Sequence, residues 1–237
     1  MKLNPNHKLL IASTSTVFGS GYLEYILDDA ANFLQTDEIL FIPYAQPSGI
    51  SFEEYTENPK KAFGEKNISV KGIHEFENPK EAILNAKAIF TGGGNTFLLL
   101  KTLYELNLIE AIKETVNSGI PYMGTSAGSN LCGLTIGTTN DMPIVYPPSF
   151  EALGFLPFNI NPHYLDPDLN STHKGETRET RIKEFHKFNS QAVLGLREGS
   201  WLEVKNGKIE LKGSLTARLF RQDEKPVELA SGRVGEW

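Results

Sequence analysis

The chain has 237 residues, of which 40% are hydrophobic and 22% charged, and its 23 basic and 29 acidic side chains leave a net charge of −6. This composition excludes a disordered chain, and the negative charge argues against a general nucleic-acid binder. One cysteine, Cys132, excludes an intrachain disulfide, and the apolar runs are too short for a signal peptide or a membrane-spanning helix, so we expect a cytoplasmic protein that binds neither nucleic acid nor membrane.

Strand and helix patterns alternate through the first half of the chain. Helical spacing of apolar residues, or a helix-start signal such as Asn78-Pro79, predicts helices at 22–34, 52–66, from 79 onward and at 98–109. Short apolar runs predict buried strands at 8–12, 38–45, 68–73, 88–91 and 120–123. Strands separated by helices favour βαβ units, so we expect an α/β fold with helices on both faces of a mostly parallel sheet.

The second half of the chain has a different pattern. The proline-rich stretch 134–172 predicts long loops with short strands, and long loops in a compact domain are often functional. A helix at 175–188, a strand at 192–196 and a hairpin turning at Asn206-Gly207 follow. Because the sequence contains no linker, repeat or low-complexity tract, we expect one domain, 1–237.

Ser126 stands at the centre of a G-x-S-x-G motif, Gly124 to Gly128. A predicted strand precedes it and a plausible helix, 127–131, follows it. A sharp strand-to-helix turn of this kind exposes a serine hydroxyl as a nucleophile. The alternative is a glycine-rich turn that the serine merely caps.

A serine hydroxyl needs a base, and the base needs an orienting carboxylate. His163 and His173 lie in the loop region and are the candidate bases, whereas the other three histidines have ordinary structural or surface positions. Asp141 and Glu198 are both plausible carboxylates by position. Either acid could instead be a solvated surface charge.

Gly92-Gly93-Gly94 ends one predicted strand and begins a helix. Its backbone N–H groups could hold an anion, or donate to an oxyanion near Ser126. Arg178 lies on the face of its helix that Ile182, Phe185 and Phe188 form, which predicts that it points along the buried side. The alternative for Arg178 is a structural salt bridge.

Four residues with side chains that bind metals lie close together in the loop region: His163, Asp166, Asp168 and His173. Their spacing matches no two-histidine helical signature, and the group contains no cysteine. We therefore expect no metal site and no cofactor.

Several segments resemble, in the same order, those of the peptidase E family, the α-aspartyl dipeptidases among the serine peptidases. They run from the middle of the chain nearly to its end: GGGNTFLLLK at 92–101, GTSAGSN at 124–130, TTNDMPIV at 138–145, INPH at 160–163, HKGETRETRI at 173–182 and LREGSWLEV at 196–204. The resemblance implies a class I glutamine-amidotransferase-like (flavodoxin-like) α/β fold with a nucleophile elbow.

The resemblance also implies roles for single residues. Ser126 is expected to be the nucleophile and His163 the general base, with the backbone N–H groups of Gly94 and Ala127 as oxyanion donors. Asp141 matches the carboxylate usually given as the third member of the triad.

Glu198 is the rival for that role, and the resemblance slightly favours Asp141. Arg178 matches an arginine suited to the carboxylate of an aspartyl side chain. Asn95 and His173 are expected to help bind the substrate.

The function that the resemblance implies is a serine dipeptidase that hydrolyses dipeptides with a free N-terminal aspartate through an acyl-enzyme. Its partner would be a small acidic dipeptide. Two alternatives stay open: a related serine hydrolase of the cyanophycinase or esterase type, and a non-catalytic module that binds a small anion at Gly92 to Asn95.

Overall fold

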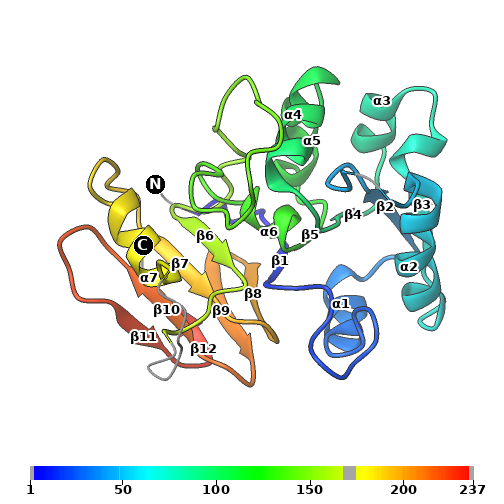
Figure 1. Ribbon diagram of the computed structural model, residues 1–237. Coiled ribbons are helices and arrows are strands. Elements are labelled where there is room, and N and C mark those ends of the chain that lie inside the picture. The colour runs from blue at the N-terminus through cyan, green and yellow to red at the C-terminus, as the bar shows by residue number, and fades with distance from the viewer. Residues whose placement is uncertain (1–2, 48, 168–174, 235–237) are drawn as a thin grey trace.

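Two β-sheets organise the chain in the computed structural model, which describes residues 3–47, 49–167 and 175–234 (Figure 1). One sheet has eight strands, in the order β12-β9-β8-β1-β5-β4-β2-β3, and the other has four, in the order β11-β10-β7-β6. The parallel strands of the large sheet are β1 Leu9–Ala12, β2 Glu38–Ile42, β3 Ser69–Gly72, β4 Ile89–Thr91 and β5 Tyr122–Thr125. Its antiparallel strands are β8 Ser200–Lys205, β9 Lys208–Gly213 and β12 Gly232–Val234.

Helices cover both faces of the parallel strands (Figure 1). Alternate residues of a strand point to opposite faces, so Leu9 and Ile11 join one buried cluster and Leu10 and Ala12 join the other. The first cluster packs against α3 Pro79–Leu84, α4 Thr96–Glu105 and α5 Ile109–Asn117, and the second against α1 Leu27–Leu34 and α2 Phe52–Gly64. The predicted α/β fold with a mostly parallel sheet is therefore confirmed.

The small sheet lies beside the large one, on the left of Figure 1. Its strands β6 and β7 run parallel, with Pro162 opposite Leu196. Of the two short helices nearby, α6 follows β5 and precedes β6, and α7 lies between β6 and β7. The bounds are β6 Asn159–Pro162, α6 Ala127–Asn130, α7 Arg178–Phe185, β7 Val193–Leu196, β10 Ala217–Phe220 and β11 Val227–Leu229, with a 3₁₀ turn at Ile73–Glu75.

Left-handed backbone positions shorten two of the predicted helices. Leu23 has a φ of 58°, so the helix expected from residue 22 begins only at Leu27. Asn107, at a φ of 55°, divides the helix expected at 98–109 into α4 and α5.

The buried face predicted for the helix at 175–188 is only partly correct. Ile182 is buried at 2% exposure, but Phe188 lies beyond the end of α7 and is 92% exposed. The predicted hairpin is confirmed, because β8 and β9 join at Asn206 and Gly207, which both have positive φ.

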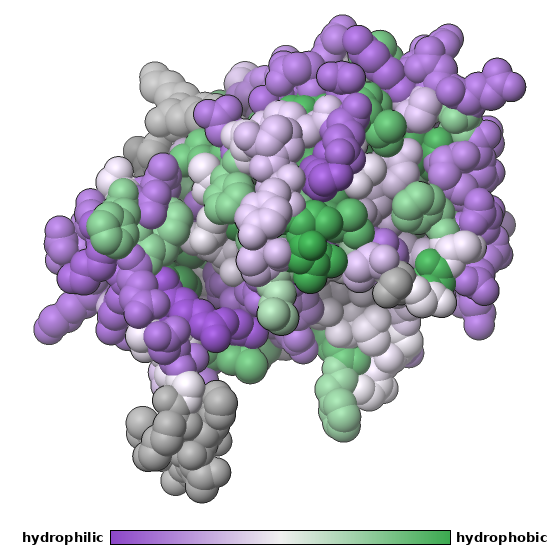
Figure 2. Space-filling view, turned by 45° about the horizontal axis from the view of Figure 1, so that its top comes forward, coloured by the Kyte–Doolittle hydropathy of each residue, from purple (hydrophilic) through white to green (hydrophobic). Residues whose placement is uncertain are grey.

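Hydrophilic side chains predominate on the face of the molecule that Figure 2 shows, with hydrophobic patches between them. The segment between α6 and β6 exposes several large apolar side chains, among them Met142, Ile144 and Tyr146. Within the described ranges, every helix is too short or too polar to cross a bilayer.

Candidate active site

Four parallel strands end at one edge of the large sheet, and the segments that follow them carry the candidate site. β1 leads into Ser13, β2 into the segment that reaches Gln46, β4 into Gly92, and β5 into Ser126. The crevice outside the carboxyl ends of such strands is where open α/β sheets bind ligands.

Ser126 sits in a strained turn between β5 and α6. Its φ of 51° and ψ of −109° lie outside the regions that a non-glycine residue ordinarily adopts. The two glycines of the motif allow the chain to make this turn, since a Cβ on Gly124 would lie 2.5 Å from the carbonyl oxygen of Gly128, and one on Gly128 only 2.2 Å from that of Thr91. The expected strand-turn-helix setting of the motif is therefore present.

His163 and Glu198 meet because β6 and β7 are parallel neighbours. His163 directly follows β6 and Glu198 lies two residues beyond β7, so both side chains extend from the same end of the small sheet. His163 Nε2 lies 2.9 Å from Ser126 Oγ, and His163 Nδ1 lies 2.6 Å from Glu198 Oε1. With the proton on Nδ1, the imidazole donates to the carboxylate and accepts from the serine, the arrangement of a nucleophile with its base and orienting acid.

Ser13 holds the backbone of His163 in place. His163 has a φ of 53°, and its N–H donates to Ser13 Oγ at 2.9 Å, while the Ser13 hydroxyl donates to the carbonyl of Leu196 at 2.7 Å. This fully buried serine thus joins the ends of β6 and β7. Sequence reasoning missed it, although a serine directly after a buried parallel strand is at the edge where such sites form.

Asp141, the carboxylate favoured from the sequence, lies elsewhere in the site. Its Oδ2 accepts the backbone N–H of Thr96 at 2.7 Å and the hydroxyl of Thr139 at 3.0 Å. It therefore supports the first turn of α4, where an acid is favourable. In the structure, Glu198 is the carboxylate that contacts His163, so the geometry favours the rival over Asp141.

The glycine loop approaches Ser126 closely. A Cβ on Gly93 would lie 3.1 Å from Ser126 Cβ, and one on Gly94 only 2.2 Å from the carbonyl oxygen of Ala45. Gly94 also has a φ of +138°, which L side chains rarely adopt. In the described part of the chain, the N–H groups of Gly93, Gly94 and Ala127 donate to no protein acceptor, which leaves them open to an anionic oxygen.

Asn95 uses its polar groups to fix the end of this loop. Its Oδ1 accepts the N–H of Leu98 at 3.0 Å and caps α4, its Nδ2 donates to the carbonyl of Met142 at 2.9 Å, and its backbone N–H donates to that of Ala45 at 2.7 Å. The N–H of Gly92 is also bonded, within the sheet. Only the middle of the loop therefore offers free donors, and they lie beside Ser126.

The sequence matches the model of Peptidase family S51 over residues 9–212. The chain belongs to peptidase family S51. It is 51% identical to Peptidase E of Streptomyces coelicolor over 94% of this chain and 91% of that protein. It is 46% identical to a Drosophila melanogaster protein named "Probable alpha-aspartyl dipeptidase", over 94% of this chain and 93% of that protein.

The solved structure of a peptidase from an acI-B1 Actinobacterium has the same fold as this S51 peptidase. The TM-score is 0.72 at 16% identity, over 95% of this chain and 96% of that one. Together with the family match, these comparisons confirm the expected family and a serine-type dipeptidase.

Arg178 is the first residue of α7 in this S51 peptidase and is partly buried. Burial lowers its pKa, and the neighbouring Arg181 adds to this effect, while Asp141 opposes it. An arginine nonetheless stays charged at neutral pH. Among the described residues Arg178 has no hydrogen-bond or ion-pair partner, so its guanidinium is available to an anionic ligand.

Two of the predicted loop residues, Asp168 and His173, lie outside the described residues, as does the neighbouring cation Lys174. Of the two described members, His163 belongs to the site above, and Asp166 pairs with Arg197 at 2.8 Å. Asp166 is thus an ion-pair partner at the end of the small sheet.

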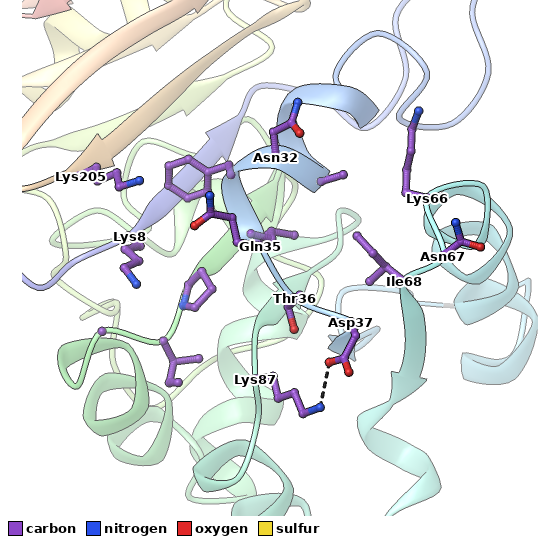
Figure 3. A pocket seen from close by; sticks show the side chains of 16 residues that line it. Lys8, Asn32, Gln35, Thr36, Asp37, Lys66, Asn67, Ile68, Lys87 and Lys205 are labelled. Atoms are coloured by element: carbon purple, nitrogen blue, oxygen red, sulfur yellow. Dashed lines mark hydrogen bonds and ion pairs between the residues drawn. The ribbon is translucent and has the colours of Figure 1, made fainter.

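Two hollows of different character lie at opposite edges of the large sheet. The one at the site has a volume of about 360 Å³ and is lined by residues that include Gln46, Tyr55, Ser126 and His163. The other, of about 960 Å³, lies at the amino ends of the strands and is bordered by Lys8, Lys66, Lys87 and Lys205 (Figure 3). The larger hollow contains none of the predicted site residues.

Proposed function

We propose that this peptidase hydrolyses dipeptides with a free N-terminal aspartate, through an acyl-enzyme on Ser126. The observation that carries the proposal is the chain of contacts from Ser126 Oγ to His163 Nε2, at 2.9 Å, and from His163 Nδ1 to Glu198, at 2.6 Å. A hydroxyl becomes a useful nucleophile near pH 7 only beside such a base.

In the first half of the reaction, Ser126 Oγ attacks the scissile carbonyl carbon while its proton passes to His163 Nε2. Glu198 stabilises the imidazolium that forms. The negative oxygen of the tetrahedral intermediate accepts hydrogen bonds from the free backbone N–H groups of Gly94 and Ala127. The C–N bond then breaks, and the proton on His163 passes to the leaving amine.

In the second half, water attacks the aspartyl ester on Ser126. His163 takes a proton from the water and returns it to Ser126 Oγ as aspartate leaves. The same oxyanion donors serve both halves, because the acyl carbonyl carbon occupies the same position in each.

Arg178 is the proposed partner of the aspartyl side chain. The net charge of −6 repels an acidic dipeptide at long range, so recognition requires a local cation. A guanidinium can hold a carboxylate with two parallel hydrogen bonds. Asp141 acts electrostatically on Arg178, so the two residues lie near each other. Asp141 accepts the N–H of Thr96 at the start of α4, directly after the glycine loop, and this position favours the assignment.

A panel of dipeptides tests the proposal. Hydrolysis of Asp-Leu, Asn-Leu, Glu-Leu and N-acetyl-Asp-Leu is measured by the release of leucine. We expect rapid turnover of Asp-Leu and slow turnover of the other three. Equal turnover of Asp-Leu and Asn-Leu would contradict the specificity, and activity on an ester or a β-linked aspartyl polymer alone would favour the related hydrolases.

A further inference from the structure

The carbonyl oxygen of Gly93 accepts hydrogen bonds from two side chains outside the triad. Tyr55, in α2, donates its hydroxyl at 3.0 Å, and Gln46, after β2, donates Nε2 at 3.2 Å. Gly93 itself lies against Ser126, since a Cβ on it would lie 3.7 Å from Ser126 Oγ. Two distant segments therefore act on a peptide group that touches the candidate nucleophile.

Holding this carbonyl also fixes the direction of the next N–H group. The peptide bond between Gly93 and Gly94 is trans and planar, so its C=O and N–H point in opposite directions. While Tyr55 and Gln46 hold the oxygen on their side, the N–H of Gly94 must point to the other side. That N–H donates to no acceptor within the described residues.

This peptide needs such support because glycine flanks it on both sides. Rotation of a peptide group between two glycines meets little steric resistance. The bonds from the N–H groups of Gly92 and Asn95, at 3.2 and 2.7 Å, fix the two ends of the loop but leave the middle peptide free. A rotated peptide would present its carbonyl oxygen to the negative charge of the intermediate, and the two would repel each other.

The surroundings of Tyr55 suit it to hold the loop. Its side chain is buried, and a Cβ on Gly92 would lie only 2.6 Å from its hydroxyl oxygen, so glycine at this position makes room for the hydroxyl. Burial raises the pKa of Tyr55, which keeps the hydroxyl protonated and able to donate. A carbonyl that accepts two hydrogen bonds is also more polarised, and its peptide N–H is a better donor.

We propose that Tyr55 and Gln46 are positioning residues for the oxyanion hole: by holding the Gly93 carbonyl they present the N–H of Gly94 to the oxyanion formed on Ser126. The inference rests on the proposed function, and it adds two residues whose described hydrogen bonds go to the Gly93 carbonyl and not to the triad. It also gives a reason for the three consecutive glycines.

The test uses Tyr55→Phe, Gln46→Met and the double variant. Each replacement keeps the bulk of the side chain. Tyr55→Phe removes the hydroxyl, and Gln46→Met removes the Nε2 donor together with the amide oxygen. For Asp-Leu we expect kcat to fall about 10-fold in each single variant and about 100-fold or more in the double variant, since losing one oxyanion donor costs about 10²–10³-fold. KM and competitive inhibition by aspartate should stay within about twofold, because they measure ground-state binding.

Two further readouts separate positioning from general damage. The apparent pKa of the pH profile of kcat/KM should be the same in the variants as in the parent protein, because the triad is untouched. Tyr104→Phe is the matched control: its hydroxyl donates to the carbonyl of Glu151 at 3.0 Å, away from the site, and its removal should leave kcat unchanged.

A double variant with kcat within twofold of the parent would overturn the inference. The inference would also fail if KM and the inhibition constant of aspartate rose by the same factor as kcat fell. Ser126→Ala, measured in the same series, distinguishes the two proposals. If it is inactive while the double variant is fully active, only the inference fails; if it keeps full activity, the proposed function fails and the inference fails with it.

Discussion

His163 Nδ1 lies 2.6 Å from Glu198 Oε1, and this contact joins residues 35 positions apart in the sequence. It exists because the parallel pairing of β6 with β7 brings the ends of both strands together. The competing acid, Asp141, is held by the first turn of α4.

The first prediction compares these two acids. Glu198→Gln should lower kcat by about 10³–10⁴-fold, because an amide cannot hold the imidazole in the required tautomer or stabilise its charge. Asp141→Asn should lower kcat by only about 10–100-fold, the effect of disturbing a supporting hydrogen bond. Steady-state hydrolysis of Asp-Leu checks both, and a larger loss in Asp141→Asn would return the role to that residue.

The second prediction concerns Ser13. Ser13→Ala removes the acceptor for the His163 N–H and the donor to the buried carbonyl of Leu196. We expect a loss of stability of about 1–3 kcal/mol for groups left without partners, and a decrease in kcat of about 10–100-fold as His163 loses its position. Thermal unfolding and steady-state kinetics measure the two effects.

Ser20→Ala is the control for Ser13, because among the described residues the hydroxyl of Ser20 bonds only the carbonyls of its own turn. It should leave kcat unchanged. Parental kcat in Ser13→Ala would show that the backbone of His163 needs no such support.

The third prediction concerns specificity. Arg178→Met should remove most of the preference for Asp-Leu over Asn-Leu, a change of about 30- to several-thousand-fold, since a half-paired buried charge costs about 2–5 kcal/mol. Arg178→Lys should recover part of it, because an ammonium keeps the charge but loses the planar pair of donors. The ratio of the two kcat/KM values is the measurement.

Arg181 provides the control for charge alone. It lies in the same helix, is more exposed and pairs with Glu176 at 3.8 Å, so Arg181→Met should keep the ratio. An unchanged ratio in Arg178→Met would place the cation elsewhere, and Lys174 would be tested next.

The fourth prediction tests the close approach of the glycine loop. A Cβ on Gly93 would lie 3.1 Å from Ser126 Cβ, so Gly93→Ala should displace the serine or the loop and lower kcat by at least about 10-fold. Gly64→Ala is the matched control, because a Cβ at Gly64 would meet nothing within 4 Å in the part of the chain that the structure describes. Parental kcat in Gly93→Ala would contradict the tight packing between loop and serine.

Local patterns were enough to predict much of the fold. The alternation of apolar runs with helical spacing predicts the parallel sheet, and Gly124 and Gly128 around Ser126 predict the turn. The helix boundaries at Leu23 and Asn107 could not be predicted in this way, because left-handed backbone at a non-glycine residue has no reliable pattern in the sequence.

The choice between Asp141 and Glu198 depends on pairing between distant strands. Both acids stand at reasonable positions in the sequence, and only the register of β6 against β7 places one of them on His163. The same holds for Tyr55, since nothing in its helix indicates that the hydroxyl reaches the carbonyl of Gly93.

The turnover of Asp-Leu by Ser126→Ala shows whether Ser126 is the nucleophile. Ser118→Ala is the matched control, because Ser118 follows the C-terminal end of α5 and its hydroxyl donates to the carbonyl of Thr115. We expect turnover by Ser126→Ala to fall by about 10⁴-fold or more while its unfolding temperature and aspartate binding are retained. Turnover near that of Ser118→Ala would contradict it.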